Sequence, residues 1–507
     1  MSTMSRRPRL AFLPALLLVA SLASTAQAEG DAKGKKPSEL EDHLVTTSHS
    51  VTIGGQRVRY EATAGTLVMR DEEGAPKATI FYIAYTRQDG RDPSKRPLTF
   101  SFNGGPGSSS VWLHLGTLGP KRVHMDPDGF PLPPPYKLVD NAESILDVTD
   151  LVFIDPVMTG YSRPAPDEDR EQFHGIDEDV RSVGEFIRLY TTRNERWASP
   201  KFLVGESYGT TRAAGLAGWL QGRHGFYLNG VMLISSILDF QTARFDTGND
   251  LPYILFLPTY TATAWYHDRL APDLQRDLRA TLDEVEEFAT TEYTLALMKG
   301  DRLGDAERNA IAKKLARYTG LSEQYVKDTN LRIKIFRFTK ELRRDERKTV
   351  GRLDSRFVGD DRDSAGERYE YDPSYSAIQG PYTATLNDYV RRDLGFESDL
   401  PYEILTGRVH PWSYESYQNR YVNVSETLRR SMTRNPSLKV FVANGYYDLA
   451  TPYFATEYTF DHLGLPKELQ GNVTMGWYEA GHMMYIHIPS LVALKRDLAA
   501  FMQSATK

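Results

Sequence analysis

The chain has 507 residues, of which 40% are apolar and 25% are charged, the composition of a soluble globular protein with a sizeable core. Its formal net charge is −6, and no Lys/Arg-rich tract is interleaved with aromatic residues, so nucleic acid is set aside as a partner. The chain contains no cysteine, which excludes thiol catalysis, thiolate metal sites and disulfide bonds.

The N-terminus has the pattern of an export signal. Three arginines within residues 6–9 precede an apolar run over 10–20, and Ala26-Gln27-Ala28 supplies small residues for cleavage before Glu29. We therefore predict a signal peptide over 1–28 and a secreted or periplasmic mature protein. A retained membrane anchor is the alternative, but the apolar run is short and is interrupted by Pro14, so we expect no stable membrane insertion after processing.

Residues 29–45 are polar and show no periodicity, which predicts a flexible leader. Beyond them, alternating segments are separated by the turn signals Gly54-Gly55 and Glu73-Gly74. The pattern predicts an antiparallel meander made of strands over 50–54, 57–64, 65–70 and 78–86.

From Leu98 onwards the pattern changes to short, continuously apolar runs, which are typical of buried parallel strands. A stretch over 177–193 has helical spacing and would serve as a crossover helix. The whole predicts an α/β fold with a mostly parallel central sheet, whose strands run over 98–102, 151–154, 201–204, 231–235 and 439–443.

The strand pattern stops over 241–402, where charge-rich amphipathic helices are predicted at 273–298, 305–318 and 322–344, followed by a polar loop over 351–374. Because parallel strands resume at 439, we interpret 241–402 as a helical cap inserted between a first core part, 46–240, and a second, 403–507. Asp360, Asp361 and Asp363 lie in the loop, but their spacing fits no EF-hand and favours an exposed acidic loop. We expect neither a metal nor a cofactor.

Ser207 lies in Gly205-Glu206-Ser207-Tyr208-Gly209, after the apolar run 202–204 and before a small-residue stretch over 210–217. A strand, a sharp turn and a helix form the context of a nucleophile elbow, in which the serine hydroxyl projects above the sheet edge. An ordinary glycine-rich turn is the alternative, and the partners of the serine argue against it.

A serine nucleophile needs a base, and the base needs an acid that orients it. In this fold class the chain order is Ser, acid, His, each after a strand. Asp448 follows the strand predicted at 439–443, and His482 follows an apolar stretch over 473–478 near the C-terminus. Asp239 is the alternative acid; the histidines that fit less well are His410, His462 and His487.

An oxyanion hole needs two backbone donors, one of them from the residue after the nucleophile, here Tyr208. The other is predicted in the glycine-rich turn over 103–110, which begins Asn103-Gly104-Gly105-Pro106-Gly107. Such a turn can also bind phosphate, but no Gly-Lys-Ser/Thr follows it.

Four segments of the chain together resemble the signatures of the serine carboxypeptidase family. They are Asn103 to Ser109, Gly205 to Gly209, Gly445 to Asp448 and Gly481 to Met483, and Ile154 to Val157 with Gly160 to Ser162 is also similar to that family. The resemblance implies an α/β-hydrolase fold and an exported serine-type carboxypeptidase that hydrolyses C-terminal peptide bonds through an acyl-enzyme. Its substrates would be peptide or protein C-termini.

The resemblance also implies a role for each matching residue. Ser207 would be the nucleophile, His482 the general base and then acid, and Asp448 the group that orients the imidazole. The remaining expected site residues are Gly105 and Tyr208 for the oxyanion, and Asn103, Gly104 and Glu206 for the terminal carboxylate of the substrate.

The chain departs from the family pattern at two positions. Thr117 stands where the family usually has a second glutamate, and Ser108 replaces a frequent disulfide cysteine. Because a threonine cannot share a titrating proton with the substrate, we expect a pH optimum shifted upward from strongly acidic.

Two other function classes stay open at this point: an acyltransferase or esterase that uses the same triad, and a non-catalytic binding module that retains the fold. The side-chain preference is unassigned. Four aromatic residues are candidates for lining the pocket, although packing is the more common role: Trp412, Tyr414, Tyr417 and Tyr421.

Overall fold

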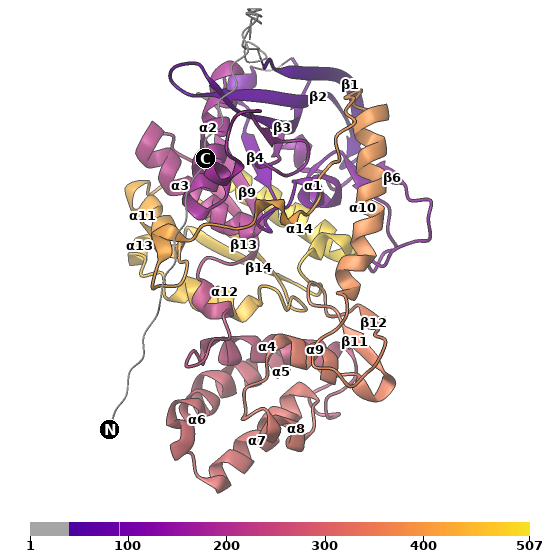
Figure 1. The fold of residues 1–507 in the computed structure, drawn as a ribbon, viewed down its shortest axis with the longest axis vertical. Coiled ribbons are helices and arrows are strands. Elements are labelled where there is room, and N and C mark those ends of the chain that lie inside the picture. The colour runs from indigo at the N-terminus through magenta and orange to yellow at the C-terminus, as the bar shows by residue number, and fades with distance from the viewer. Residues whose placement is uncertain (1–39, 91) are drawn as a thin grey trace, which may run out of the picture. The chain divides into compact units, whose positions relative to one another are not determined.

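The computed structural model describes residues 40–507, except Arg91. In this part of the chain, ten strands form one mixed sheet in the order β1-β2-β3-β7-β4-β9-β10-β13-β14, with β8 paired to β3 (Figure 1). The strands are β1 (His43–Ile53), β2 (Gln56–Arg70), β3 (Pro76–Arg87), β4 (Leu98–Phe102), β7 (Asp150–Ile154), β8 (Arg163–Pro164), β9 (Lys201–Ser207), β10 (Gly230–Ser236), β13 (Lys439–Gly445) and β14 (Val473–Tyr478).

Strands β1, β2 and β3 form the predicted antiparallel meander. Gly54-Gly55 makes a two-residue turn, since Ile53 pairs with Gln56 across it. Two details differ from the expectation. β2 is one continuous strand through Gly65, and β1 begins at His43, so the last three residues of the predicted leader are paired with β2. The predicted signal peptide and the rest of the leader up to residue 39 lie outside the described residues.

The parallel half of the sheet runs from β7 to β14, and all of its strands except the edge strand β14 are buried on both faces. Successive side chains of a strand point to opposite faces, so in β9 Leu203 packs with one hydrophobic cluster and Phe202 and Val204 pack with another. The Leu203 side is covered by α2 (Ile176–Arg193) and α3 (Tyr208–His224), and the other side by α14 (Ile488–Ala505).

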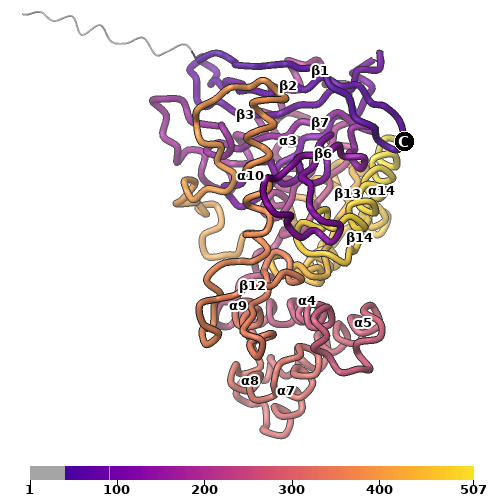
Figure 2. Tube along the Cα trace, turned by 90° about the vertical axis from the view of Figure 1, so that its right-hand side faces the viewer, coloured from indigo at the N-terminus to yellow at the C-terminus, as the bar shows by residue number. Residues whose placement is uncertain are grey.

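The segment predicted as a cap is mainly helical and has its own hydrophobic cluster. Its last helix, α10 (Pro373–Arg392), packs in the hydrophobic cluster of the central sheet, contrary to the expectation for a cap. Figures 1 and 2 show the other helices grouped together away from the central sheet. They are α4 (Leu251–Tyr266), α5 (Leu278–Phe288), α6 (Thr294–Lys299), α7 (Asp305–Thr319), α8 (Glu323–Asp328) and α9 (Ile335–Glu341). The boundaries of the cap as a domain stay a prediction.

Two of the predicted cap helices are interrupted. The helix expected over 273–298 is divided into α5 and α6 by a π-helical turn, Ala289–Tyr293. The helix expected over 322–344 is divided into α8 and α9, because Asn330 and Leu331 have positive φ angles of 52° and 63°, which no α-helix accommodates. The loop predicted over 351–374 contains a short strand, β12 (Val358–Asp360), which pairs with β11 (Lys348–Val350).

The remaining elements connect the sheet strands and the cap. A small hairpin consists of β5 (Lys121–Val123) and β6 (Leu138–Asp140), and the helices are α1 (Val111–Leu113), α10 (Pro373–Arg392), α11 (Ser425–Arg434), α12 (Tyr453–Asp461) and α13 (Lys467–Gln470). Within residues 40–507, Arg91 aside, no helix combines the length and apolar character needed to cross a membrane. The residues that the sequence nominates for the site lie at the carboxyl ends of β4, β9, β13 and β14 or directly after them, because the carboxyl ends of parallel strands meet at one edge.

Candidate active site

Ser207 lies at the junction of β9 and α3 in the geometry of a nucleophile elbow. Its φ and ψ angles are 60° and −130°, a conformation that non-glycine residues rarely adopt. The turn is tight: a Cβ atom on Gly205 would lie 2.1 Å from the carbonyl oxygen of Gly209. Only glycine therefore fits two positions before the serine, and the strained turn leaves Ser207 partly exposed at the pocket.

Asp448 and His482 form a buried pair in the two loops that follow β13 and β14. The His482 Nδ1 atom lies 2.7 Å from Asp448 Oδ2. Asp448 is fully buried and also accepts hydrogen bonds from the backbone N–H of Ala450 (2.7 Å) and from Thr451, through its N–H (3.0 Å) and its Oγ1 (2.7 Å). With Nδ1–H donating to the carboxylate, the neutral imidazole has an unprotonated Nε2.

Burial and charge act in opposite directions on His482. Burial lowers the pKa of its imidazole, but the attraction and hydrogen bond of Asp448 outweigh burial, with a smaller contribution from Glu206, so the pKa is raised above 6.5. An imidazole of this kind accepts a proton readily at neutral pH, which is the property required of a general base.

One pocket of about 360 Å³ contains both Ser207 and His482 on its wall. Asn103, Gly104 and Gly105, from the loop after β4, also line it. A Cβ atom on Gly104 would lie 2.5 Å from the backbone nitrogen of Tyr208, so this loop packs directly against the first turn of α3. The first N–H groups of a helix have no partner within the helix, which leaves the Tyr208 N–H available to a ligand.

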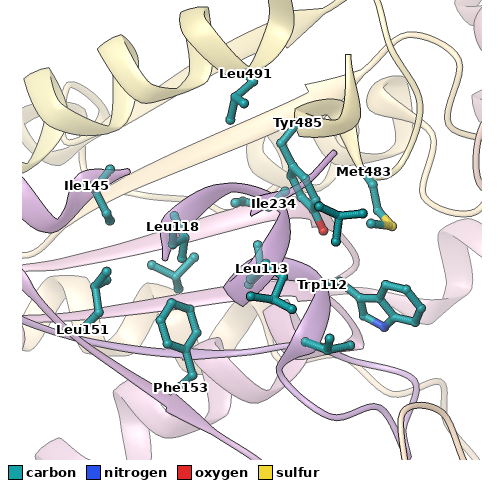
Figure 3. Packing of buried hydrophobic residues seen from close by; sticks show 14 of the residues in the cluster. Trp112, Leu113, Leu118, Ile145, Leu151, Phe153, Ile234, Met483, Tyr485 and Leu491 are labelled. Carbon is teal, nitrogen blue, oxygen red and sulfur yellow. The ribbon is translucent and has the colours of Figure 1, made fainter. Parts of the chain in front are cut away.

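Glu206 also lines this pocket and is only 3% exposed. Burial raises the pKa of its carboxyl to about 7; His482 and a hydrogen bond from Tyr485 lower it, and Asp448 raises it. Tyr485 Oη donates to Glu206 Oε2 at 2.5 Å. Figure 3 shows the Tyr485 ring among the buried side chains near Met483 and Trp112. Glu206 therefore keeps its proton to a higher pH than an ordinary glutamate.

Asn103 offers a second polar group next to Glu206. Its Oδ1 atom accepts from the backbone N–H of Leu113 at 3.1 Å, which fixes the amide. Its Nδ2 atom is buried and makes no hydrogen bond of normal geometry with residues 40–507, Arg91 excepted, but the Asn103 amide lies close enough to Glu206 to lower the pKa of that carboxyl. A buried, oriented and unpaired donor on a pocket wall is suited to bind an acceptor on a ligand.

Thr117 has a structural role and is not part of the pocket wall. It is buried in the π-helical turn His114–Leu118, and its carbonyl accepts a hydrogen bond from the Asn141 side chain at 2.6 Å. It is not among the residues that line the pocket. The polar partner that Glu206 has in this structure is Tyr485, from the loop after His482.

Sequence reasoning missed a segment of the insertion, 351–357, that holds the loops of both Asp448 and His482. The backbone N–H of His482 donates to the carbonyl of Leu353 at 2.6 Å. Asp354 accepts from the N–H of Gly481 at 3.1 Å and forms a buried ion pair with Arg356 at 2.7 Å. On the other side, the N–H of Ser355 donates to the carbonyl of Tyr447 at 3.0 Å.

No local pattern in the sequence could have revealed these contacts of 351–357, because its partners lie about a hundred residues away. Thr451 is different, since an aspartate commonly accepts N–H and hydroxyl hydrogen bonds from residues two and three positions later. The hydrogen bond from Thr451 could therefore have been predicted from its position three residues after Asp448.

The alternatives weighed at the sequence level lie elsewhere in the structure. Asp239 caps a short 3₁₀ helix by accepting from the N–H of Gln241 at 2.9 Å. His487 contacts Ser490 at 2.8 Å. Trp412 packs edge to face on the Tyr208 ring, and none of the four aromatic candidates over 412–421 lines the pocket. In the acidic loop, Lys348 pairs with Asp360 and Lys340 with Asp361.

Comparison with known proteins identifies relatives of the chain. The model of the serine carboxypeptidase family matches residues 55–486. The pheromone-processing carboxypeptidase KEX1 of Saccharomyces cerevisiae is 35% identical over 115 residues, which make up 22% of this chain and 14% of the yeast protein. The chain thus matches only a small part of the length of that relative.

Among solved structures, that of KEX1(delta)P, a prohormone-processing carboxypeptidase from Saccharomyces cerevisiae, is similar with a TM-score of 0.54. The sequence identity is 18%, over 88% of this chain and 91% of the other. A proline iminopeptidase from Mycobacterium smegmatis matches 91% of this chain and 99% of its own at 14% identity, with a TM-score of 0.33. The fold prediction, an α/β hydrolase with a mostly parallel sheet, is confirmed. The family model spans most of the chain, and the chain belongs to the serine carboxypeptidase family.

Proposed function

We propose that this protein is an exported serine-type carboxypeptidase that removes C-terminal residues from peptides. The observation that carries the proposal is the single pocket that contains a strained serine and a histidine whose Nδ1 lies 2.7 Å from a buried aspartate. This is the arrangement of a nucleophile, a base and an orienting acid.

In the proposed mechanism, Ser207 Oγ attacks the carbonyl carbon of the last peptide bond while His482 Nε2 takes the hydroxyl proton. The N–H groups of Gly105 and Tyr208 bind the oxygen on which negative charge develops. His482 then gives its proton to the leaving amine, and the acyl group stays on Ser207 as an ester. Water hydrolyses the ester with His482 again acting as base, and Asp448 stabilises the imidazolium in both steps.

Exopeptidase specificity requires a group that recognises the free carboxylate of the substrate. Asn103, Gly104 and Glu206 line the pocket next to Ser207, and the unpaired Nδ2 of Asn103 can donate to that carboxylate. A protonated Glu206 can share its proton with the carboxylate, whereas an ionised one would repel it. The raised pKa of Glu206, about 7, supports the first role over a wide pH range.

The function is tested with a peptide pool analysed by mass spectrometry after incubation with the protein. We expect products shortened from the C-terminus, and at least about tenfold lower kcat/KM for C-terminally amidated copies, since the amide loses charge-assisted hydrogen bonds. Ser207→Ala and His482→Ala should each lower hydrolysis by about a thousandfold or more in folded protein. Equal rates on free and amidated termini would instead favour an endopeptidase or esterase.

Export is the remaining part of the proposal, and it is supported by the sequence pattern over 1–28. The mature protein would begin at Glu29 and act outside the cytoplasm. A chain without cysteine can form no disulfide bond under the oxidising conditions of such a compartment.

A further inference from the structure

Arg352 is a charged residue of the pocket wall that the mechanism does not use. It comes from the insertion, beside Leu353, and lines the same pocket as Ser207 and His482. Its guanidinium makes no hydrogen bond and no ion pair with the part of the chain that the structure describes. An arginine has five N–H donors in a planar fork, so this one has its full donor capacity available to a ligand.

The backbone of Arg352 is fixed, although its side chain has no partner. Its N–H donates to Asp372 Oδ1 at 3.1 Å, and its carbonyl accepts from the N–H of Leu449 at 3.0 Å. Leu449 directly follows Asp448, and Leu353 holds the N–H of His482. The Cα atom of Arg352 is therefore tied to both loops that carry the acid and the histidine, so its side chain starts beside the reaction centre.

Neither Asp372 nor Glu206, the two carboxyl groups of the pocket, forms an ion pair with this guanidinium. Asp372 caps α10, and its oxygens accept from the N–H and hydroxyl of Ser374 as well as from the N–H groups of Arg352 and Leu353. Glu206 is paired with Tyr485. The positive charge of Arg352 nevertheless acts across the pocket, since its proximity lowers the pKa of His482.

We propose that Arg352 binds the side-chain carboxylate of an acidic residue next to the scissile bond, so that the enzyme prefers peptides with glutamate or aspartate at the last or penultimate position. A guanidinium pairs with a carboxylate through two parallel hydrogen bonds, which makes this group selective as well as attractive. The inference rests on the proposed carboxypeptidase function and deepens it.

A side chain is the favoured source of the carboxylate, because a different wall of the pocket is equipped for the terminal one. Asn103 and Glu206 come from the loop after β4 and from the elbow, whereas Arg352 comes from the insertion. Asp372 and Tyr369 also belong to the wall near Arg352. The pocket has apolar residues as well, which can cover the methylene groups of an acidic side chain; they include Leu353, Tyr375, Ile378 and Met483.

The test uses N-acetylated tetrapeptides of alanine with glutamate or glutamine at the last or the penultimate position. For the wild-type protein we expect kcat/KM to be about tenfold higher for glutamate than for glutamine at one of the two positions. In Arg352→Gln this ratio should fall to about one, and Arg352→Lys should keep part of it, because lysine retains the charge without the fork. The ratio cancels any change in the pKa of His482, which affects both peptides equally.

Arg347→Gln is the matched control, because Arg347 is an exposed residue of the same insertion, does not line the pocket and carries the same charge. It should keep the wild-type ratio. A wild-type ratio of one at both positions, or an unchanged ratio in Arg352→Gln, would overturn the proposal. The proposal would also be overturned if Arg352→Gln lost only the preference for free-acid over amidated peptides. That result would mean that Arg352 binds the terminal carboxylate.

A binding measurement separates this inference from the proposed function. Calorimetry of the same peptides with Ser207→Ala, and with Ser207→Ala/Arg352→Gln, needs no turnover. We expect about tenfold tighter binding of the glutamate peptide only when Arg352 is present. If the wild-type protein hydrolyses none of the peptides but the difference in binding persists, the carboxypeptidase function is wrong and the acid-binding role of Arg352 stands. If the glutamate and glutamine peptides bind equally well when Arg352 is present, the role of Arg352 is wrong.

Discussion

Replacing Glu206 by glutamine should change the pH dependence of stability in a defined direction. Glu206 is 3% exposed, and burial raises the pKa of its carboxyl from 4.5 to about 7. Between these two pH values the unfolded chain releases the proton and the folded chain keeps it. The stabilisation from this group is therefore complete below pH 4.5 and is lost as the pH rises through 7, which amounts to about 3 kcal/mol at about 1.36 kcal/mol per pH unit.

The assay is urea denaturation of wild-type protein and Glu206→Gln at intervals from pH 4 to pH 9. The free energy of unfolding of the variant minus that of the wild type should increase by about 3 kcal/mol between pH 4 and pH 8. All other titrating groups are common to both proteins, so they largely cancel in the difference. Glu73→Gln, in the exposed turn after β2, is the matched control and should give a flat difference.

The same substitution should also change how the KM for free-acid peptides depends on pH. As Glu206 ionises above pH 7, it repels the substrate carboxylate, so the KM of the wild type for free-acid peptides should increase there. The KM of Glu206→Gln should stay level, while both proteins gain activity as His482 loses its proton. Parallel stability curves and parallel KM profiles for the two proteins would refute the reasoning, because they would mean that Glu206 is ionised throughout.

Three further outcomes are expected. Tyr485→Phe removes a hydrogen bond that lowers the pKa of Glu206, so the alkaline limb of the kcat/KM profile should move to higher pH. The variant should also lose about 1–3 kcal/mol of stability. An unchanged pH profile would contradict the role of Tyr485. Gly104→Ala places a Cβ atom 2.5 Å from the backbone nitrogen of Tyr208 and should lower kcat by about a hundredfold or more, and full activity would argue against an oxyanion site there. Finally, N-terminal sequencing should find Glu29 at the start of an extracytoplasmic protein; a cytoplasmic protein that begins at its initiator methionine would rule out processing.

The sequence alone was sufficient for the buried parallel strands of the sheet and for the chain order of the candidate triad. Strands such as 201–204 and 439–443 are buried on both faces, so they are continuous apolar runs that need no knowledge of their neighbours. Ser207 was readable because a nucleophile elbow requires glycines at fixed positions on either side of it. Asp448 and His482 followed from the rule that parallel strands deliver their loops to one edge.

Local pattern failed where the chain conformation depends on tertiary contacts. The apolar spacing over 273–298 and 322–344 is that of two long helices, yet each is interrupted, by a π-helical turn and by the positive φ angles at 330 and 331. The N-terminal boundary of β1 was also misjudged. His43 to Val45 are held by pairing with β2, which compensates for their polar and non-periodic sequence.

Only the tertiary structure decided which side chains surround the triad. Tyr485 is 279 residues from Glu206, and Arg352 and Asp354 belong to an insertion with no motif, yet these residues contact or line the site. In the sequence, Thr117 showed that the second glutamate of the family pattern is missing. Nothing in the sequence indicates that the phenol of Tyr485 donates a hydrogen bond to Glu206. A motif constrains residues a few positions apart, whereas the ionisation of a buried carboxyl depends on every charge and dipole that folding brings within a few ångströms of it.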